Sequence, residues 1–201
     1  KRVLLDSIYD FILQNTQNTS SIIDIFSGTT NVSRYFRNKG YNVVSNDINR
    51  FSYILGLTYL GNKEVPQFSR LNLPEASKEQ LSKLEDSFIK SIKKDKAQLF
   101  THEEKNIKAY DSIFKVLNYL NNLESLKVEN TYIMDYFCAN GKKSKYKSIR
   151  GTEVNRNYFS LENAKNINMI MEQIKIWWKN GLLTKQEISL LLTSIIEEIV
   201  L

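Results

Sequence analysis

The sequence is poor in residues that break helices or cross-link a chain. Its 201 residues include only 2 prolines and 7 glycines, a composition that favours helices with few interruptions. The single cysteine, Cys138, excludes an internal disulfide and a zinc site built from cysteines, and is typical of a reducing cytosol. The single histidine, His102, begins a charged segment, so nothing supports nucleophilic or acid–base catalysis by cysteine or histidine.

Long apolar runs are also absent. The most apolar segment, residues 188–201, is interrupted by serine, threonine and glutamate and is too short to span a bilayer. We therefore expect no membrane partner and a cytoplasmic location. The N-terminus has no signal-peptide pattern, and because it begins at Lys1 we expect the natural chain to start earlier. The net charge of +6 permits nucleic-acid binding without proving it.

The N-terminal part contains the pattern of a β-α-β unit. Residues 21–26 are β-branched and apolar, which predicts a buried strand, and a turn rich in helix-capping residues follows at 27–31. A helix over 32–39 ends at Gly40, and residues 42–45 form a second predicted strand. This order predicts an α/β fold with parallel strands joined by a right-handed crossover.

Helices dominate the rest of the chain, in which apolar residues recur at helical spacing. The spacing predicts helices over 3–14, 51–60, 77–96, 103–126, 160–180 and 184–201, a short strand over 132–136, and a long polar loop over 139–157. Ser160 is a predicted N-cap, and Thr184 with Glu187 forms a capping box. We expect three parts. Residues 1–65 form the cofactor-binding part, residues 66–160 form a target-recognition region, and residues 161–201 form helices that pack back on the core.

The strand–turn–helix around Gly28 is the most informative place, because ligands bind at the C-terminal ends of parallel strands. Asp24 ends the first predicted strand, and Asp47 follows the second, 19 residues after Gly28. A single glycine disfavours a dinucleotide, whose pyrophosphate needs close backbone approach at several points. S-adenosylmethionine fits better, with its ammonium on Asp24 and its ribose on Asp47. Other ligands of doubly wound folds remain open at this point.

Residues 24–36 and 40–48 resemble the cofactor motif and the acidic motif of the DNA adenine methylase family. The family's first motif is usually Asp-x-Phe-x-Gly-x-Gly, and Thr30 stands here at the second glycine. Lys1 with the leucines after it is similar to the end of the family's N-terminal motif. The resemblance implies S-adenosylmethionine as cofactor, held by Lys1, Asp24, Ile25, Phe26, Ser27, Gly28, Thr29, Thr30, Asp47 and Ile48.

Four later stretches, 116–124, 135–141, 156–164 and 177–187, are similar to the family's target-recognition region. The resemblance implies a Rossmann-like methyltransferase half-sheet with flanking helices, joined to a mainly helical region that reads double-stranded DNA. A basic cluster within this region either forms a solvated face or contacts phosphates. The expected DNA-binding residues are Lys142, Lys143, Lys145, Tyr146, Lys147, Arg150, Arg156 and Tyr158.

The family's catalytic motif, Asp/Asn-Pro-Pro-Tyr/Phe, is missing. The prolines, Pro66 and Pro74, stand in other contexts, and in family order the motif should follow the last predicted helix. We therefore expect no catalytic residue in this chain, no metal site, and no methyl transfer by the chain alone. A two-stranded sheet also buries too little to stand alone. Both points predict a complementary C-terminal chain with the Pro-Pro motif, separately encoded or separated by proteolysis.

The leading hypothesis is the N-terminal portion of an adenine-specific DNA methyltransferase from a restriction–modification system, with a cognate endonuclease as a further candidate partner. The alternative is a non-catalytic DNA-recognition or specificity subunit that keeps the fold, which the departure at Thr30 and the missing motif favour. A small-molecule methyltransferase is a weaker third reading, because such a substrate does not need the long Lys/Asn-rich middle.

Overall fold

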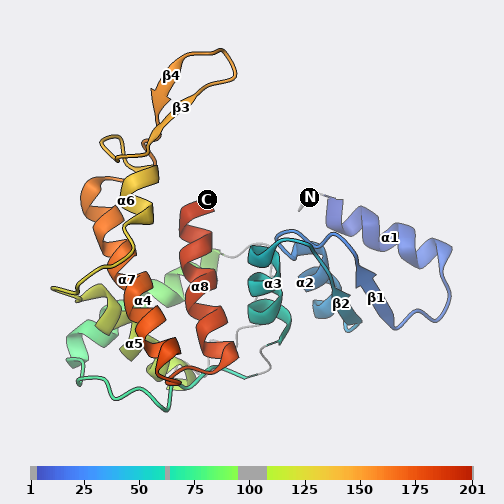
Figure 1. Cartoon of the computed structure of the whole chain (residues 1–201). Helices are drawn as coiled ribbons and strands as arrows, with labels where there is room; N and C mark the ends of the chain where they lie inside the picture. The colour runs from blue at the N-terminus through green and yellow to red at the C-terminus, as the bar shows by residue number, and fades with distance from the viewer. Residues whose placement is uncertain (1–3, 62–63, 95–107, 201) are drawn as a thin grey trace.

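The computed structural model describes residues 4–61, 64–94 and 108–200 and has a mixed α/β architecture (Figure 1). Its elements, in chain order, are α1 (Leu5–Asn15), β1 (Ser21–Asp24), α2 (Asn31–Asn38), β2 (Asn42–Ser45), α3 (Arg50–Gly56), the π-helix η2 (Leu57–Gly61), α4 (Lys78–Lys94), α5 (Asp111–Asn121), α6 (Tyr132–Phe137), β3 (Lys145–Lys147), β4 (Glu153–Asn155), α7 (Leu161–Lys179) and α8 (Lys185–Val200). Within the described part, helices far outnumber strands, as the shortage of glycine and proline predicts.

The predicted β-α-β unit is present at the N-terminal end. Strands β1 and β2 pair in parallel, with Ile22 opposite Val43 and Ile23 opposite Val44. Val43 faces the helices, because it lines a cavity together with residues of α3 and η2. Ile23 and Val44 point to the other face and are 66% and 60% exposed. Helices therefore cover one face of this small sheet and leave the other bare within the described residues.

An aromatic cluster packs α1 against α2. Phe36, on α2, is fully buried and lies with its ring 5.8 Å from that of Tyr9 and 5.5 Å from that of Tyr41. Tyr35 donates a hydrogen bond from its hydroxyl to Asp6 of α1 at 2.6 Å. Desolvation and the Asp6 carboxylate together raise the pKa of Tyr35 to about 12. The predicted amphipathic helix at the N-terminus is thereby fixed on the β-α-β unit.

Helix α8 joins the N-terminal unit to the helical remainder, and Figure 1 shows it beside α3. Thr58 of η2 shares a buried 2.9 Å hydrogen bond with Thr193 of α8. Tyr59 of the same π-helix donates to Glu197, and burial together with this carboxylate raises the Tyr59 pKa. The α-helix changes to a π-helix at Leu57, so Thr58 and Tyr59, whose hydroxyl groups contact α8, both lie in the π-helix.

The main core lies between α5, α7 and α8. Val116, Ile174 and Trp177 are buried there, whereas the neighbouring Trp178 is 44% exposed, as expected for adjacent positions on a helix. The two predicted helix starts are confirmed. Ser160 Oγ accepts from the Asn163 amide at 3.1 Å, and Thr184 and Glu187 form the reciprocal capping box at 3.2 and 2.7 Å.

Two local predictions are wrong. The expected strand at 132–136 is helix α6, because this segment buries Ile133 against Ala164 of α7 rather than pairing with a strand. The expected loop at 139–157 contains the antiparallel hairpin of β3 and β4, whose residues are almost all exposed and so show no apolar alternation. In addition, the helix predicted over 51–60 ends as a π-helix. His102 lies outside the described residues.

Candidate functional site

The C-terminal ends of β1 and β2 are joined by a set of backbone hydrogen bonds. The amide of Asn46 donates to the Asp24 carbonyl at 2.9 Å, and the amide of Ser27 donates to the Asn46 carbonyl at 3.0 Å. These bonds continue the parallel pairing beyond the last paired residues. The turn after β1 and the residues after β2, which the sequence predicts as one site, therefore lie side by side.

Asp47 completes this junction with its side chain. Its carboxylate accepts from the Gly28 amide at 2.8 Å and from the Asn49 amide at 2.9 Å. These backbone donors, that of Asn49 first, lower the pKa of Asp47. Because both amides donate to the charged form, Asp47 is an anion at neutral pH and fixes the glycine turn against the end of β2.

Asp24 is held by a residue that the sequence did not single out. Ser33, 1% exposed on the first turns of α2, donates from its hydroxyl to Asp24 Oδ2 at 2.7 Å. This bond sets the direction of the carboxylate at the end of β1. The sequence signal is a serine nine residues after the aspartate, which alone is too common to identify such a pair.

The turn between β1 and α2 contains two residues in the left-handed backbone region. Gly28 has φ +53°, and a Cβ built at this position would meet no atom within 4 Å. Thr30 has φ +61° although it is β-branched, and its side chain is fully buried, with its hydroxyl donating to the Thr29 carbonyl. The left-handed region explains why the related motif has glycine at the Thr30 position.

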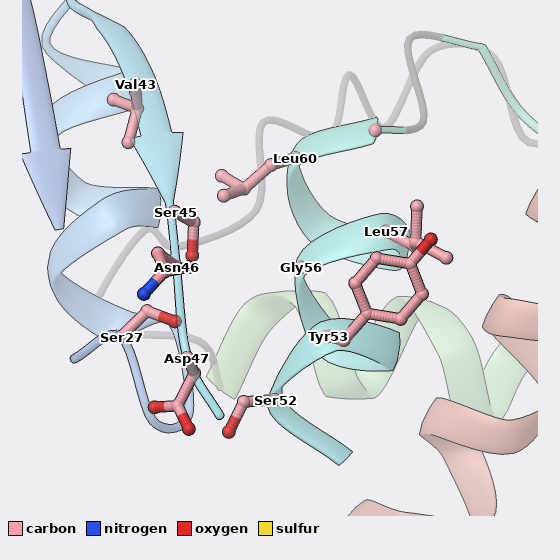
Figure 2. A pocket seen from close by; sticks show the side chains of 11 residues that line it. Ser27, Val43, Ser45, Asn46, Asp47, Ser52, Tyr53, Gly56, Leu57 and Leu60 are labelled. Atoms are coloured by element: carbon pink, nitrogen blue, oxygen red, sulfur yellow. The ribbon is translucent and has the colours of Figure 1, made fainter. Parts of the chain in front are cut away.

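A cavity of about 300 Å³ lies between β2 and the α3–η2 segment (Figure 2). Ser27 and Asp47 line it at the strand ends, and Ser52 and Tyr53 line it from α3. Ser52 is 1% exposed, and its hydroxyl has no hydrogen-bond partner among the described residues. The sequence predicted Ser27 and Asp47, but not Ser52, because a serine inside a helix carries no signal of its own.

The other predicted cofactor residues are distributed around this junction. Gly28, Thr29 and Thr30 form the turn itself. Ile25, Phe26 and Ile48 follow the two strands and are exposed, Phe26 by 82% and Ile48 by 98%. Lys1 lies outside the described residues.

The predicted DNA-binding residues gather on and beside the β3–β4 hairpin, which projects from the body beyond α6 (Figure 1). Lys145 and Lys147 lie on β3, and both are exposed. At the base of the hairpin, the Arg156 guanidinium lies 4.8 Å from the Tyr146 ring centroid, and the Lys143 ammonium lies 5.3 Å from that of Tyr136. Lys142, Arg150 and Tyr158 are exposed on the same projection.

In the described ranges 4–61, 64–94 and 108–200, no group of three or more His, Cys, Asp or Glu side chains is placed to hold a metal ion. Nor is any of the helices in these ranges long and apolar enough to cross a bilayer.

The family model for D12 class N6 adenine-specific DNA methyltransferases matches residues 1–189. The chain belongs to this family. The match confirms the resemblance seen in the cofactor, acidic and recognition stretches. Enzymes of this kind generally use S-adenosylmethionine and act on DNA.

Two curated relatives of this D12 chain are modification enzymes. Modification methylase StsI of Streptococcus sanguinis is 28% identical over 198 residues, which are 98% of this chain and 22% of the relative. Type II methyltransferase M.FokI of Planomicrobium okeanokoites is 28% identical over 197 residues, 98% of this chain and 23% of the relative. The chain thus spans less than a quarter of the length of these relatives. No solved structure gives a significant match.

Proposed function

We propose that this chain is the cofactor-binding and DNA-reading portion of an adenine-specific DNA methyltransferase of a restriction–modification system. The observation that carries the proposal is the junction of Gly28 with Asp47 at the ends of two parallel strands, in a chain of the D12 family. The β1–α2–β2 unit then forms half of a Rossmann-like sheet, with its ligand at the strand ends.

S-adenosylmethionine supplies the methyl group when bound, and this chain's residues position it. Asp47, already ionised, is suited to accept hydrogen bonds from the ribose hydroxyls, and Asp24, oriented by Ser33, is suited to pair with the ammonium. The exposed ring of Phe26 and the exposed side chain of Ile48 offer apolar surface against which the adenine of the cofactor can pack. The proposed cofactor set is Lys1, Asp24, Ile25, Phe26, Ser27, Gly28, Thr29, Thr30, Asp47 and Ile48.

The cavity beside β2 extends this proposal to Ser52. Its buried hydroxyl has no partner within the described ranges, and an unpaired buried hydroxyl is costly. A nucleoside entering between Asp47 and α3 supplies hydroxyl and amino groups that satisfy it. The cavity of about 300 Å³ has room for the nucleoside part of such a ligand, at the lower end of the range of small-molecule sites.

The β3–β4 hairpin is the proposed DNA contact. Its lysines stand on a projection away from the core, where a solvated basic strand pair can enter a groove of the duplex or follow its phosphates. Arg156 and Lys143 make cation–π contacts with tyrosine rings, and these contacts stabilise the base of the hairpin. Lys142, Lys145, Tyr146, Lys147, Arg150 and Tyr158 complete the proposed contact set.

The catalytic Pro-Pro motif is proposed to lie in a complementary C-terminal methyltransferase chain. Two observations support this: the motif is not among the 201 residues, and no described residue covers the face of the β1–β2 sheet to which Ile23 and Val44 point. Parallel sheets are normally covered on both faces, so further strands and helices are needed to bury these side chains. A cognate restriction endonuclease is the other proposed partner, in keeping with the modification enzymes among the relatives.

A second candidate function, a non-catalytic recognition subunit, is favoured by one observation. Thr30 occupies a left-handed position where the related motif has glycine, so the turn beside the proposed cofactor site carries a backbone strain that glycine would avoid. Calorimetric titration of S-adenosylmethionine into the assembled protein separates the two functions. If the assembled protein binds the cofactor and Asp47→Ala abolishes this binding, the methyltransferase function is supported. If the assembled protein does not bind the cofactor at all, the recognition-subunit function is supported.

DNA binding is tested separately, by measuring duplex affinity as a function of salt. Replacing Lys142, Lys143 and Lys145 with glutamate should weaken binding and flatten its salt dependence, because fewer counterions are released. The matched control reverses three exposed lysines far from the hairpin: Lys78, Lys83 and Lys90, all on α4. Unchanged affinity after the hairpin substitutions would place the DNA contact elsewhere.

A further inference from the structure

A second cavity, of about 250 Å³, lies between α7, α8 and the segment that leads into α6. Polar side chains form one wall: Asn168, Glu172 and Lys175 follow one another at spacings of four and three residues on one face of α7. Leu192 of α8 contributes to the apolar wall opposite. The volume of the cavity is several times the roughly 30 Å³ that one water occupies, so a single buried water does not fill the cavity.

Asn168, which lines this cavity, carries a side-chain donor without a partner in the described residues. It is 2% exposed, its Oδ1 accepts from the Ile133 amide at 3.3 Å, and its Nδ2 has no partner anywhere in the described chain. The Ile133 N–H fixes which end of the side-chain amide faces it, because a donor cannot face a donor. The NH2 group is therefore the end of the amide that is left without an acceptor in the described chain, which is costly.

Glu172 supplies acceptors one helical turn away. It is 5% exposed, and its Oε1 accepts from Lys175 at 2.7 Å, while Lys175 also reaches Glu129 at 3.2 Å. Lys175 thus holds the carboxylate in place without using all of its lone pairs. One cavity wall presents a fixed donor beside a fixed acceptor.

Aromatic rings stand at the mouth of the cavity. Tyr132 and Trp178 line it and are 49% and 44% exposed, so each offers an open ring surface. Tyr132 also packs at 4.6 Å on Tyr136, over which Lys143 lies. A row of aromatic rings therefore leads from the cavity to the basic hairpin.

We propose that this cavity receives one unstacked nucleobase of the DNA held by the β3–β4 hairpin. Flat rings for stacking, with a donor and an acceptor for the base edge, are the groups that recognise a base outside a duplex. The inference rests on the proposed DNA binding, but concerns a base other than the methylation target, because no catalytic motif accompanies this cavity.

Trp178 provides the reporter for the test, since the other tryptophan, Trp177, is buried. The probes are a 12-nucleotide single strand of mixed sequence and an abasic strand with the same length and phosphate charge. We expect the first to quench Trp178 fluorescence and to bind about tenfold more tightly than the second, which is the scale of one stacked base.

Asn168→Leu removes the Nδ2 donor, together with the acceptor of the Ile133 amide, and should lose both the quenching and the preference for the base-containing strand. Asn163→Leu, at an exposed site of the same helix, is the control and should keep both. If Asn168→Leu does not fold, Trp178→Ala at the half-exposed mouth must abolish the preference instead; because this variant lacks the reporter, its affinities are measured from the anisotropy of labelled strands.

The results separate this inference from the proposed function. Equal affinity for the two strands, or full preference in folded Asn168→Leu, would overturn the base pocket. Both strands should lose affinity when Lys142, Lys143 and Lys145 are reversed. Retained affinity there would overturn the hairpin as the DNA contact, and with it the route by which a base reaches this cavity.

Discussion

At the residue scale, Asp47 fixes the turn that is proposed to bind the cofactor. Its carboxylate accepts from the amides of Gly28 and Asn49, so the glycine turn is fixed by a charge rather than by packing. An acidic residue after the second strand was predicted from its spacing to Gly28. Its bond to the Gly28 amide was not, because spacing along the chain does not give the orientation of a side chain.

Titration of Asp47 should therefore be visible at the Gly28 amide. The lowered pKa of Asp47 means that its contribution to stability is complete above the unfolded value of about 4. This contribution is lost as the pH falls through the lower folded value. In an NMR titration, the Gly28 amide shift should follow the Asp47 carboxyl carbon with one midpoint below 4. A Gly28 amide shift that does not change as the Asp47 carboxylate titrates would contradict the hydrogen bond between the two groups.

Gly28→Ala should impair cofactor binding more than folding. The left-handed backbone costs an alanine about 1–2 kcal/mol, and the added Cβ meets open space in which the cofactor is proposed to lie. Gly181→Ala is the matched control, because Gly181 has φ +68°, equally open surroundings and a position far from the strand ends. Denaturation should show similar losses for both variants, while calorimetry should show an affinity loss for Gly28→Ala alone.

At the scale of elements, Glu187 connects α8 to the segment before α4. Beyond the predicted capping box with Thr184, its second carboxylate oxygen accepts from the buried Phe68 amide at 2.6 Å. The capping box could be predicted from a four-residue pattern. The bond to Phe68 spans 119 residues, so no local pattern could have indicated it.

Glu187→Ala should lower the free energy of unfolding by about 2–3 kcal/mol, because it leaves the buried Phe68 amide without an acceptor and removes the glutamate half of the capping box of α8. Glu187→Gln keeps one acceptor oxygen and should lose about half as much. Urea denaturation measures both. Equal stability of the wild type and Glu187→Ala would show that the Phe68 amide finds another partner.

The two elements that the sequence does not predict, α6 and the β3–β4 hairpin, are missed for different physical reasons. Tyr132 and Tyr136 favour strands in general, but Ile133 found a helical partner surface on α7, and such tertiary contacts override weak local preference. The hairpin has no buried face, so the alternation that reveals strands is absent. The β-α-β unit was predictable because its strands, turn and glycine stop all indicate the same arrangement.

At the scale of the whole molecule, one face of the β1–β2 sheet is left uncovered by the described residues, whereas parallel sheets are normally covered on both faces. Val43 and Val44 are neighbours in sequence but lie on opposite faces, one against the α3–η2 cavity and one in the open. The sequence indicates that the apolar side chains of these strands must be buried on both faces of the sheet. It does not indicate which segment buries the face that carries Val44.

Substituting the two valines should reveal this asymmetry. Val44→Thr should change the free energy of unfolding of this chain by less than about 0.5 kcal/mol. Val43→Thr, the matched control on the covered face, should cost about 1–2 kcal/mol. Urea denaturation measures both changes. Equal destabilisation by both substitutions would mean that the outer face is already covered.

The most direct test of the account is methyl transfer by this chain combined with a polypeptide that carries the family's C-terminal portion and its Pro-Pro motif. The substrates are an adenine-containing duplex and S-adenosylmethionine labelled in its methyl group. We predict that label enters adenine only when both polypeptides are present, and that Asp47→Ala in this chain prevents it. Transfer by this chain alone, or no transfer with any such C-terminal portion, would contradict the account.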